Sequence, residues 1–146
     1  MNVKQISIRL ENRPGTIFDI VEALAENDMH IRALTCSASN ETGILRLLVD
    51  NVLWAASLLK NLGYDTMLQD VVLINVSGVT GGFSRVLEIM RDYDINVTHT
   101  YSIMSRNHQG RNESFMIFEV DDYIKTASVM AQKNIKVLSQ QELADL

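Results

Sequence analysis

The chain contains one sequence pattern twice, with the second copy about 66 residues after the first. In each copy a glycine-containing turn leads into an amphipathic segment. The matched pairs are Gly15 with Gly81, Ile17 with Phe83, Glu22 with Glu88, Asp28 with Asp94 and Ile31 with Val97. Later the offset becomes 71, and Leu47, Val49 and Asp50 meet Phe118, Val120 and Asp121. Self-similarity of this kind indicates two related structural units, which we predict over residues 1–69 and 70–146.

The two copies share one order of periodicities. Apolar residues alternate in a first strand, at Ile6, Ile8 and Leu10 and again at Val72, Ile74 and Val76. A helical spacing of i, i+3, i+4 and i+7 follows, at Ile17, Ile20, Val21 and Leu24 and at Phe83, Val86, Leu87 and Met90. We then predict strands over 30–37, 43–50, 96–104 and 114–121, helices over 52–62 and 123–133, and closing strands over 64–69 and 135–139. The order is β-α-β-β-α-β in both copies.

This order defines the fold class. It is typical of the ferredoxin-like, split βαβ arrangement, so we predict an α+β protein made of two βαββαβ repeats. Each repeat is an antiparallel sheet with both helices on one face. The five additional residues of the second copy lie in the polar stretch 105–112, as expected of an insertion in an exposed loop. Pro14 suits the first turn of a helix. Trp54 is expected to be a packing anchor on the second helix of the first copy, and the methionines at 67, 90, 104, 116 and 130 are expected to fill the core.

Composition excludes several classes of protein. Hydrophobic residues make up 47% and charged residues 21% of the chain, which is typical of a globular domain. The net charge is −5 and the Lys and Arg residues are scattered, so we expect no nucleic-acid partner. No apolar run is long enough for a membrane span, and the first five residues lack an apolar signal-peptide core. With Cys36 as the one cysteine, we expect a cytoplasmic protein without disulfides.

The residues around the turns carry a family resemblance. Asn12-Arg13-Pro14-Gly15, followed by an amphipathic helix and then by Asp28-Met29-His30-Ile31, resembles the ACT domain, a small amino-acid-sensing module attached to metabolic enzymes. The second copy is similar, with Asp94-Ile95-Asn96-Val97 after its helix. The resemblance covers about residues 4–139. It implies a regulatory protein with an amino acid as effector.

The resemblance also implies a binding site between paired domains. The loop after the first strand of one domain supplies one wall, and the start of the second strand of the other domain faces it. By position, the loop residues are Asn12, Arg13, Pro14, Gly15 and Thr16, and the facing residues are Asn96 and Val97. The chemistry fits a free amino acid, because a helix start offers unpaired N–H groups to a carboxylate. An asparagine side chain can both donate and accept hydrogen bonds.

The second loop departs from this pattern. It contains Gly78, Thr80, Gly81 and Gly82, and its facing residues are His30 and Ile31. It lacks the side-chain amide of Asn12. We therefore expect an asymmetric protein in which the site of Asn12 and Asn96 is the better of the two. The glycines also have an alternative role in tight strand-to-helix turns, and both asparagines have one as turn residues.

Other kinds of site find little support in the sequence. His30, His99 and His108 lie far apart and have no Cys or His at ligand spacing, so we expect no metal and no cofactor. Neither Cys36 nor any serine has a recognisable base or oxyanion site. We therefore expect a protein that is not an enzyme. The ferredoxin-like fold hosts many activities, and a small enzyme remains the least favoured hypothesis.

Two functions remain in competition. The first is a regulator that binds an amino acid, forms a homodimer, and alters either an enzyme of amino-acid metabolism or its own assembly. The second is a regulatory or structural subunit that binds such an enzyme through its sheet edges without a small ligand. A thermal response to a free amino acid would favour the first hypothesis.

Overall fold

The computed structural model describes residues 1–146, and the contacts divide them into two compact units. The N-terminal unit consists of residues 4–69 together with 143–145. The C-terminal unit consists of residues 1–3, 70–142 and 146. Each unit therefore contains a short segment from the far end of the chain. No helix has the length and apolar character that are needed to cross a membrane.

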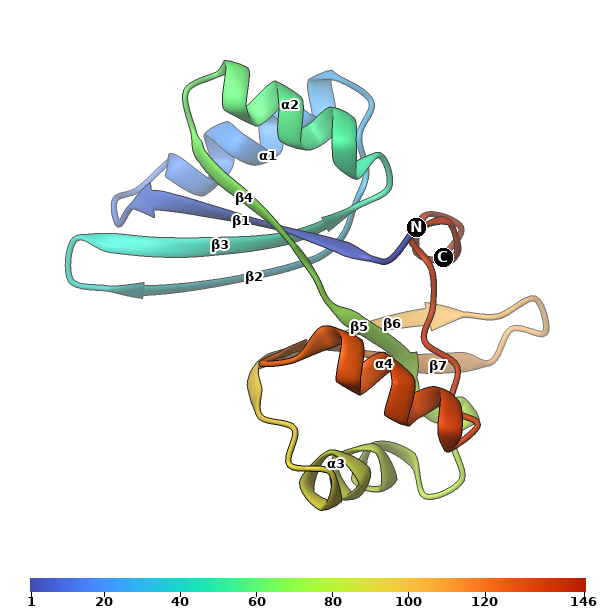
Figure 1. The fold of residues 1–146 in the computed structure, drawn as a ribbon. Helices are drawn as coiled ribbons and strands as arrows, with labels where there is room; N and C mark the ends of the chain where they lie inside the picture. Colours follow the sequence, from blue (N-terminus) through green and yellow to red (C-terminus); the bar gives the residue numbers. More distant parts are fainter. The chain divides into compact units, whose positions relative to one another are not determined.

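The N-terminal unit is a four-stranded sheet with two helices on one face (Figure 1). Its elements are β1 (Lys4–Glu11), α1 (Thr16–Glu26), β2 (Ile31–Ser39), β3 (Thr42–Val49), α2 (Val52–Asn61) and β4 (Asp65–Asp70). The strand order is β2-β3-β1-β4, with β3 antiparallel to both of its neighbours. Ile6, Ile8 and Leu10 face the helices together with Leu45, Leu47 and Val49, and this alternation gives the unit its own core.

The C-terminal unit repeats the arrangement with one strand fewer. Its elements are β5 (Val72–Asn75), the 3₁₀ turn η1 (Val76–Gly78), α3 (Gly82–Asp92), β6 (Val97–Arg106), β7 (Asn112–Val120) and α4 (Tyr123–Gln132). The sheet order is β5-β7-β6, and α3 and α4 cover one face of it (Figure 1). A second core contains Ile74, Val86, Met90, Phe118 and Met130. The predicted fold class, two antiparallel ferredoxin-like repeats, is confirmed.

The closing strand predicted over 135–139 is wrong. The N–H of Leu138 donates to the carbonyl of Leu73 at 2.9 Å, and Ser139 forms an isolated bridge with Asn2. The segment thus follows β5 without forming a continuous ladder, and Ile135 and Val137 still pack against the core. The chain then forms a short helix, α5 (Gln140–Ala144), which the sequence analysis did not predict.

Three smaller expectations also fail. Trp54 is 60% exposed, because the buried face of α2 is made by Val52, Ala55, Ala56 and Leu59. Met67 and Met104 are 60% and 70% exposed, whereas Met90 and Met130 are buried as expected. Pro14 lies in the turn before α1, since the helix begins at Thr16.

The helix ends repeat between the units. Gly15 and Gly81 precede α1 and α3 with φ values of 92° and 88°. Asp28 and Asp94 follow the same helices with φ values of 59° and 56°. Gly63 and Asn134 take the left-handed position after α2 and α4. The left-handed region is costly for most residues and is favoured by Gly, Asn and Asp, so these positions set the register of the repeat.

Candidate functional site

The β1–α1 loop is tied to the β2–β3 turn by Asn12. The Asn12 N–H donates to the Glu41 carbonyl at 2.9 Å, and its side-chain Nδ2 donates to the Asn40 carbonyl at 2.8 Å. Arg13 pairs with Glu11 at 2.8 Å, and both side chains are largely exposed. Asn12 therefore positions the loop, while Arg13 lies at the surface with an acidic neighbour in contact.

The start of α1 is open to an incoming group. Gly15 occupies the cap position in the left-handed conformation, and no side chain caps the helix. The Thr16 hydroxyl turns back to the carbonyls of Glu11 and Arg13, each at 3.1 Å, and this bond pair secures the turn. Backbone N–H groups at a helix start are unsatisfied within the helix and favour anions. The loop can therefore present N–H donors to a carboxylate.

The corresponding loop of the C-terminal unit has a different course. It contains the 3₁₀ turn η1, in which the Asn75 side chain accepts a hydrogen bond from Ser77 N–H at 3.1 Å. Gly81 and Gly82 both have positive φ, and no side chain caps α3. Thr80 and Gly78 are exposed. The two loops thus share a helix start without a side-chain cap. They differ in the residues before it, since Asn12 ties the first loop to the β2–β3 turn and the second loop contains η1.

The predicted facing residues occupy equivalent positions at the starts of β2 and β6. The N–H of His30 donates to Asp50 Oδ1 at 3.0 Å, and the N–H of Asn96 donates to Asp121 Oδ1 at 3.1 Å. In return, each aspartate N–H donates to the carbonyl of its partner at 3.1 Å. Ile31 and Val97 follow as the first residues of the two strands. Because these ties use the backbone of His30 and Asn96, the Asn96 amide group is left to other partners.

His30 and Asp50 form a further contact that the second repeat lacks. His30 Nδ1 lies 3.0 Å from Asp50 Oδ2. Burial by itself acts to raise the pKa of Asp50, but the pKa is lowered overall by hydrogen bonds from the His30 N–H, the His30 ring and the Asn51 N–H. Asp50 is therefore ionised at neutral pH and holds the imidazole ring at the start of β2.

Within one repeat the loop and the facing residues do not come together. The loop precedes α1 and His30 follows it, and the same holds for α3 and Asn96. An 11-residue helix is about 16 Å long at 1.5 Å per residue. A site that uses both groups therefore requires the loop of one repeat and the strand start of another.

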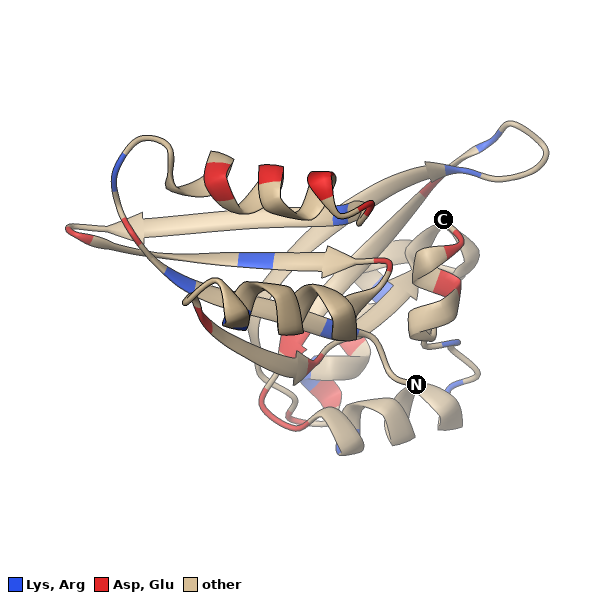
Figure 2. Ribbon diagram, turned by 90° about the horizontal axis from the view of Figure 1, so that it is seen from above, with Lys and Arg blue, Asp and Glu red and all other residues tan.

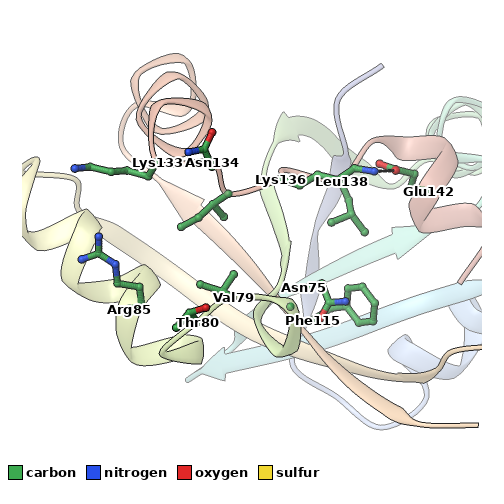
Figure 3. A pocket seen from close by; sticks show the side chains of 12 residues that line it. Asn75, Val79, Thr80, Arg85, Phe115, Lys133, Asn134, Lys136, Leu138 and Glu142 are labelled. Carbon is green, nitrogen blue, oxygen red and sulfur yellow. Dashed lines mark ion pairs between the residues drawn. The ribbon is translucent and has the colours of Figure 1, made fainter. Parts of the chain in front are cut away.

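A cavity of about 560 Å³ lies inside the C-terminal unit (Figure 3). It is bordered by the η1 loop, α3, β7 and the segment after α4. The residues that line it are Asn75, Gly78, Val79, Thr80, Arg85, Phe115, Lys133, Asn134, Ile135, Lys136, Leu138 and Glu142. Gly78 and Thr80 are the two predicted site residues among them. The other ten residues of the lining were not predicted as site residues.

No three His, Cys, Asp or Glu side chains are grouped so that they could hold a metal ion. His30 belongs to the N-terminal unit and His99 to the C-terminal unit, and His108 is exposed in the β6–β7 loop. The His30 ring has one carboxylate, that of Asp50, as its partner.

Comparison with known proteins shows the family. The ACT domain pair family matches residues 1–146. The structure resembles protein BT0572 from Bacteroides thetaiotaomicron at 27% identity and a TM-score of 0.87, covering 100% of this chain and 98% of that one. No curated protein matches the chain. The chain belongs to the ACT domain family, as a pair of ACT domains.

Two further structures share the fold at lower identity. The regulatory subunit of aspartate kinase from Thermus thermophilus is 13% identical with a TM-score of 0.58, and the match covers 90% of this chain and 93% of that one. The corresponding subunit from Thermus flavus is 13% identical with a TM-score of 0.53, with coverages of 90% and 92%. Both likenesses concern the fold alone.

Proposed function

We propose that this protein is a non-enzymatic regulator that binds a free amino acid. The observation that carries the proposal is the uncapped helix start behind a left-handed glycine in both repeats, at Gly15 and Gly81, in a chain that matches the ACT domain pair throughout. A carboxylate placed there receives backbone N–H donors and the favourable end of the helix dipole. The fold shared with regulatory subunits of aspartate kinase is consistent with a regulatory role.

The proposed binding residues are those of the β1–α1 loop together with Asn96. Gly15 has no neighbouring atom within 4 Å of the position that a Cβ would take, so a ligand can approach its backbone. The Asn96 side chain can accept from an ammonium group and donate to a carboxylate. Because one repeat cannot supply both parts, the loop and Asn96 must come from different repeats, of this chain or of a second copy in a homodimer.

Thermal unfolding of the purified protein against each of the twenty amino acids tests the proposal. A ligand that binds only the folded state adds about 2.7 kcal/mol to the free energy of unfolding at 100 times its Kd. We expect a shift for one or two amino acids, and its loss in Asn96→Ala. This variant keeps the backbone bond to Asp121. Asn61→Ala, at the exposed end of α2, is the matched control.

The absence of a shift for all twenty amino acids, in protein freed of carried-over ligand, would contradict the proposal. An equal loss in the Asn61→Ala control would show that the asparagine effect is not local. Asn12→Ala is a second variant, and it also removes the hydrogen bond that ties the loop to Asn40. The ligand-induced shift of Asn12→Ala is therefore compared with the thermal stability of the same variant without ligand.

The unpaired edge of β6 favours the second candidate function, a subunit that binds an enzyme through sheet edges. β6 is ten residues long and has β7 as its single neighbour in the sheet. An unpaired strand edge is a template for pairing with another chain. The same edge can serve a homodimer, which light scattering would detect as twice the chain mass of 16.4 kDa. Co-purification with an enzyme, with no response to amino acids, would favour the subunit role.

A further inference from the structure

We propose that the cavity of the C-terminal unit binds a small organic anion that carries two negative charges on a partly apolar body. This proposal goes beyond the amino-acid site, because it concerns another kind of ligand and, apart from Gly78 and Thr80 of the second loop, other residues. A zwitterionic amino acid has no net charge, whereas the proposed ligand is a dianion. Positive charges border the cavity, the first repeat lacks them at the equivalent positions, and apolar residues complete the lining.

Three cationic side chains border the cavity. Arg85 comes from α3, and Lys133 and Lys136 come from the end of α4 and the segment after it. Figure 3 shows Arg85 and Lys133 on one side of the cavity, and Lys136 paired with Glu142 on the other. Glu142 is the one acidic residue of the lining, which leaves a net charge of +2. The sign is opposite to that of the whole chain, whose net charge is −5 and whose charged residues are marked in Figure 2.

Lys133 and Arg85 can both contact a ligand in the cavity. Lys133 lies over the Tyr93 ring at 5.4 Å from the ring centre. Arg85 pairs with Glu88 at 2.8 Å, but both side chains are more than 40% exposed. An exposed pair of this kind contributes little stability. The Arg85 guanidinium can therefore turn to a ligand anion at small cost.

The positive charge is a property of this repeat and not of the fold. At the repeat offsets, Arg85 corresponds to Asp19, Lys133 to Leu62 and Lys136 to Asp65. The alignment of the two repeats at an offset of 71 is supported by Gly63 and Asn134, which both take the left-handed conformation after α2 and α4. The first repeat thus folds with two acidic residues and an apolar one where the second has three cations. Folding does not require the cations, so another use explains them better.

The lining also favours an anion over a zwitterion. An ammonium group needs an acceptor, and the carboxylate of Glu142 is engaged by Lys136 and by Ser139 N–H at 2.8 Å. The hydrogen bond from Lys136, followed by that from Ser139, lowers the pKa of Glu142, so this pair stays ionised. Asn75 is likewise engaged by Ser77 and Glu113. No unengaged carboxylate is left in the lining for a ligand ammonium.

Apolar residues complete the cavity. Phe115 and Ile135 are 4% and 8% exposed, and Val79 and Leu138 lie beside them in the lining. Small-molecule sites typically have volumes of roughly 300–1,000 Å³, with apolar walls and a few placed polar groups. The cavity of about 560 Å³ falls in this range. A short carbon chain between two anionic groups, or a phosphate on a small carbon body, would match both the cationic side chains and the apolar residues of the lining.

Titration of the full chain, followed by backbone-amide NMR, tests the proposal. The probes are glutarate, glycerol 3-phosphate, inorganic phosphate and the neutral diamide of glutarate. We expect saturable shifts at Phe115 and Asn134 with at least one dianion and none with the diamide. Glutarate and the phosphates separate the two kinds of dianion. Affinity should fall as salt is added, because these charges are partly exposed.

Arg85→Gln and Lys133→Gln should each weaken binding by about fivefold or more, because each removes one charge near the dianion. Lys125→Gln is the matched control, since it removes a lysine from the first turn of α4, outside the lining. Equal affinity in Lys133→Gln and Lys125→Gln, binding of the diamide, or no shift with any dianion would overturn the proposal. The Asn96→Ala variant should bind the dianion normally, which separates this result from that of the amino-acid site.

Discussion

At the scale of single residues, Gly15 and Gly81 occupy the same turn in different surroundings. Both have φ near 90°, but a Cβ on Gly15 meets nothing within 4 Å, whereas one on Gly81 would lie 3.0 Å from Arg85 Cβ. Gly15→Ala should cost about 1–2 kcal/mol for the left-handed backbone alone, and Gly81→Ala should cost more. Urea unfolding measures both, with Gly78→Ala as a control near zero, since Gly78 lacks a positive φ. Equal costs at the two sites would contradict this account.

The residue pair His30 and Asp50 predicts a pH dependence of stability. The pKa of Asp50 is lowered in the folded protein, although burial alone would raise it. Its contribution is therefore complete above the unfolded-state pKa of about 4, and is lost as the pH falls through the lower folded value. Asp50→Asn should reduce the free energy of unfolding by about 1 kcal/mol at pH 7. The difference from the natural protein should shrink below about pH 4.

Urea unfolding of both proteins between pH 7 and pH 3 makes this measurement. Asp65→Asn is the control, because the Asp65 side chain is 80% exposed and lies 4.0 Å from Arg9, whose side chain is 73% exposed. Such pairs contribute close to nothing. A difference for Asp50→Asn that stays constant with pH would contradict the assignment of the charge.

At the scale of elements, α4 differs from α1 and α3 in how it begins. The Asp122 side chain accepts the N–H of Lys125 at 3.0 Å, whereas the other two helices begin at a glycine with no side-chain cap. Asp122→Ala should lower the free energy of unfolding by about 1 kcal/mol, and Asp122→Asn should be close to neutral, because asparagine also caps. Thermal unfolding of the two variants distinguishes capping from charge at position 122. An equal loss in both would show that charge, rather than capping, is responsible.

The elements also show what the sequence could predict and where it failed. The predicted helices and the first seven strands lie within two residues of their observed ends. A single apolar face imposes a clear period on most of them, although β5 is buried on both faces. The segment 135–139 has the apolar residues of a strand but not its ladder. Ile135 and Val137 pack against the core while the backbone makes a single bond to β5. Periodicity reports which side chains are buried and does not report pairing.

The candidate site was predicted only in part for a related reason. Local patterns identified the glycine turns, and the repeat offset placed His30 and Asn96 at equivalent strand starts. The cavity was missed because Arg85 and Lys133 are 48 positions apart and lie on the polar side of their elements. A cation on a helix surface looks like a solvated residue in one sequence. Comparison of the two repeats position by position, with Asp19 opposite Arg85, was the available signal.

At the scale of the whole molecule, the two units have separate cores but exchange short segments of chain. Residues 143–145 belong with residues 4–69, where the Arg32 guanidinium donates to the Ala144 carbonyl at 2.7 Å. Residues 1–3 belong with 70–142, where Val71 N–H donates to the Val3 carbonyl at 3.1 Å. Neither unit is therefore a continuous stretch of sequence. A cut at the repeat boundary would remove a few residues from each.

This exchange predicts which unit responds to a change at the C-terminal end of the chain. Leu143 is fully buried and belongs to the N-terminal unit. Leu143→Ala should cost about 2–5 kcal/mol, as large-to-small core substitutions do. Hydrogen exchange should then accelerate more at Leu45 and Leu47 than at Ile74 and Phe118, although position 143 follows the C-terminal unit in sequence. Leu62→Ala, at an exposed position, should change neither group, and a larger acceleration at Ile74 and Phe118 would place Leu143 in the other unit.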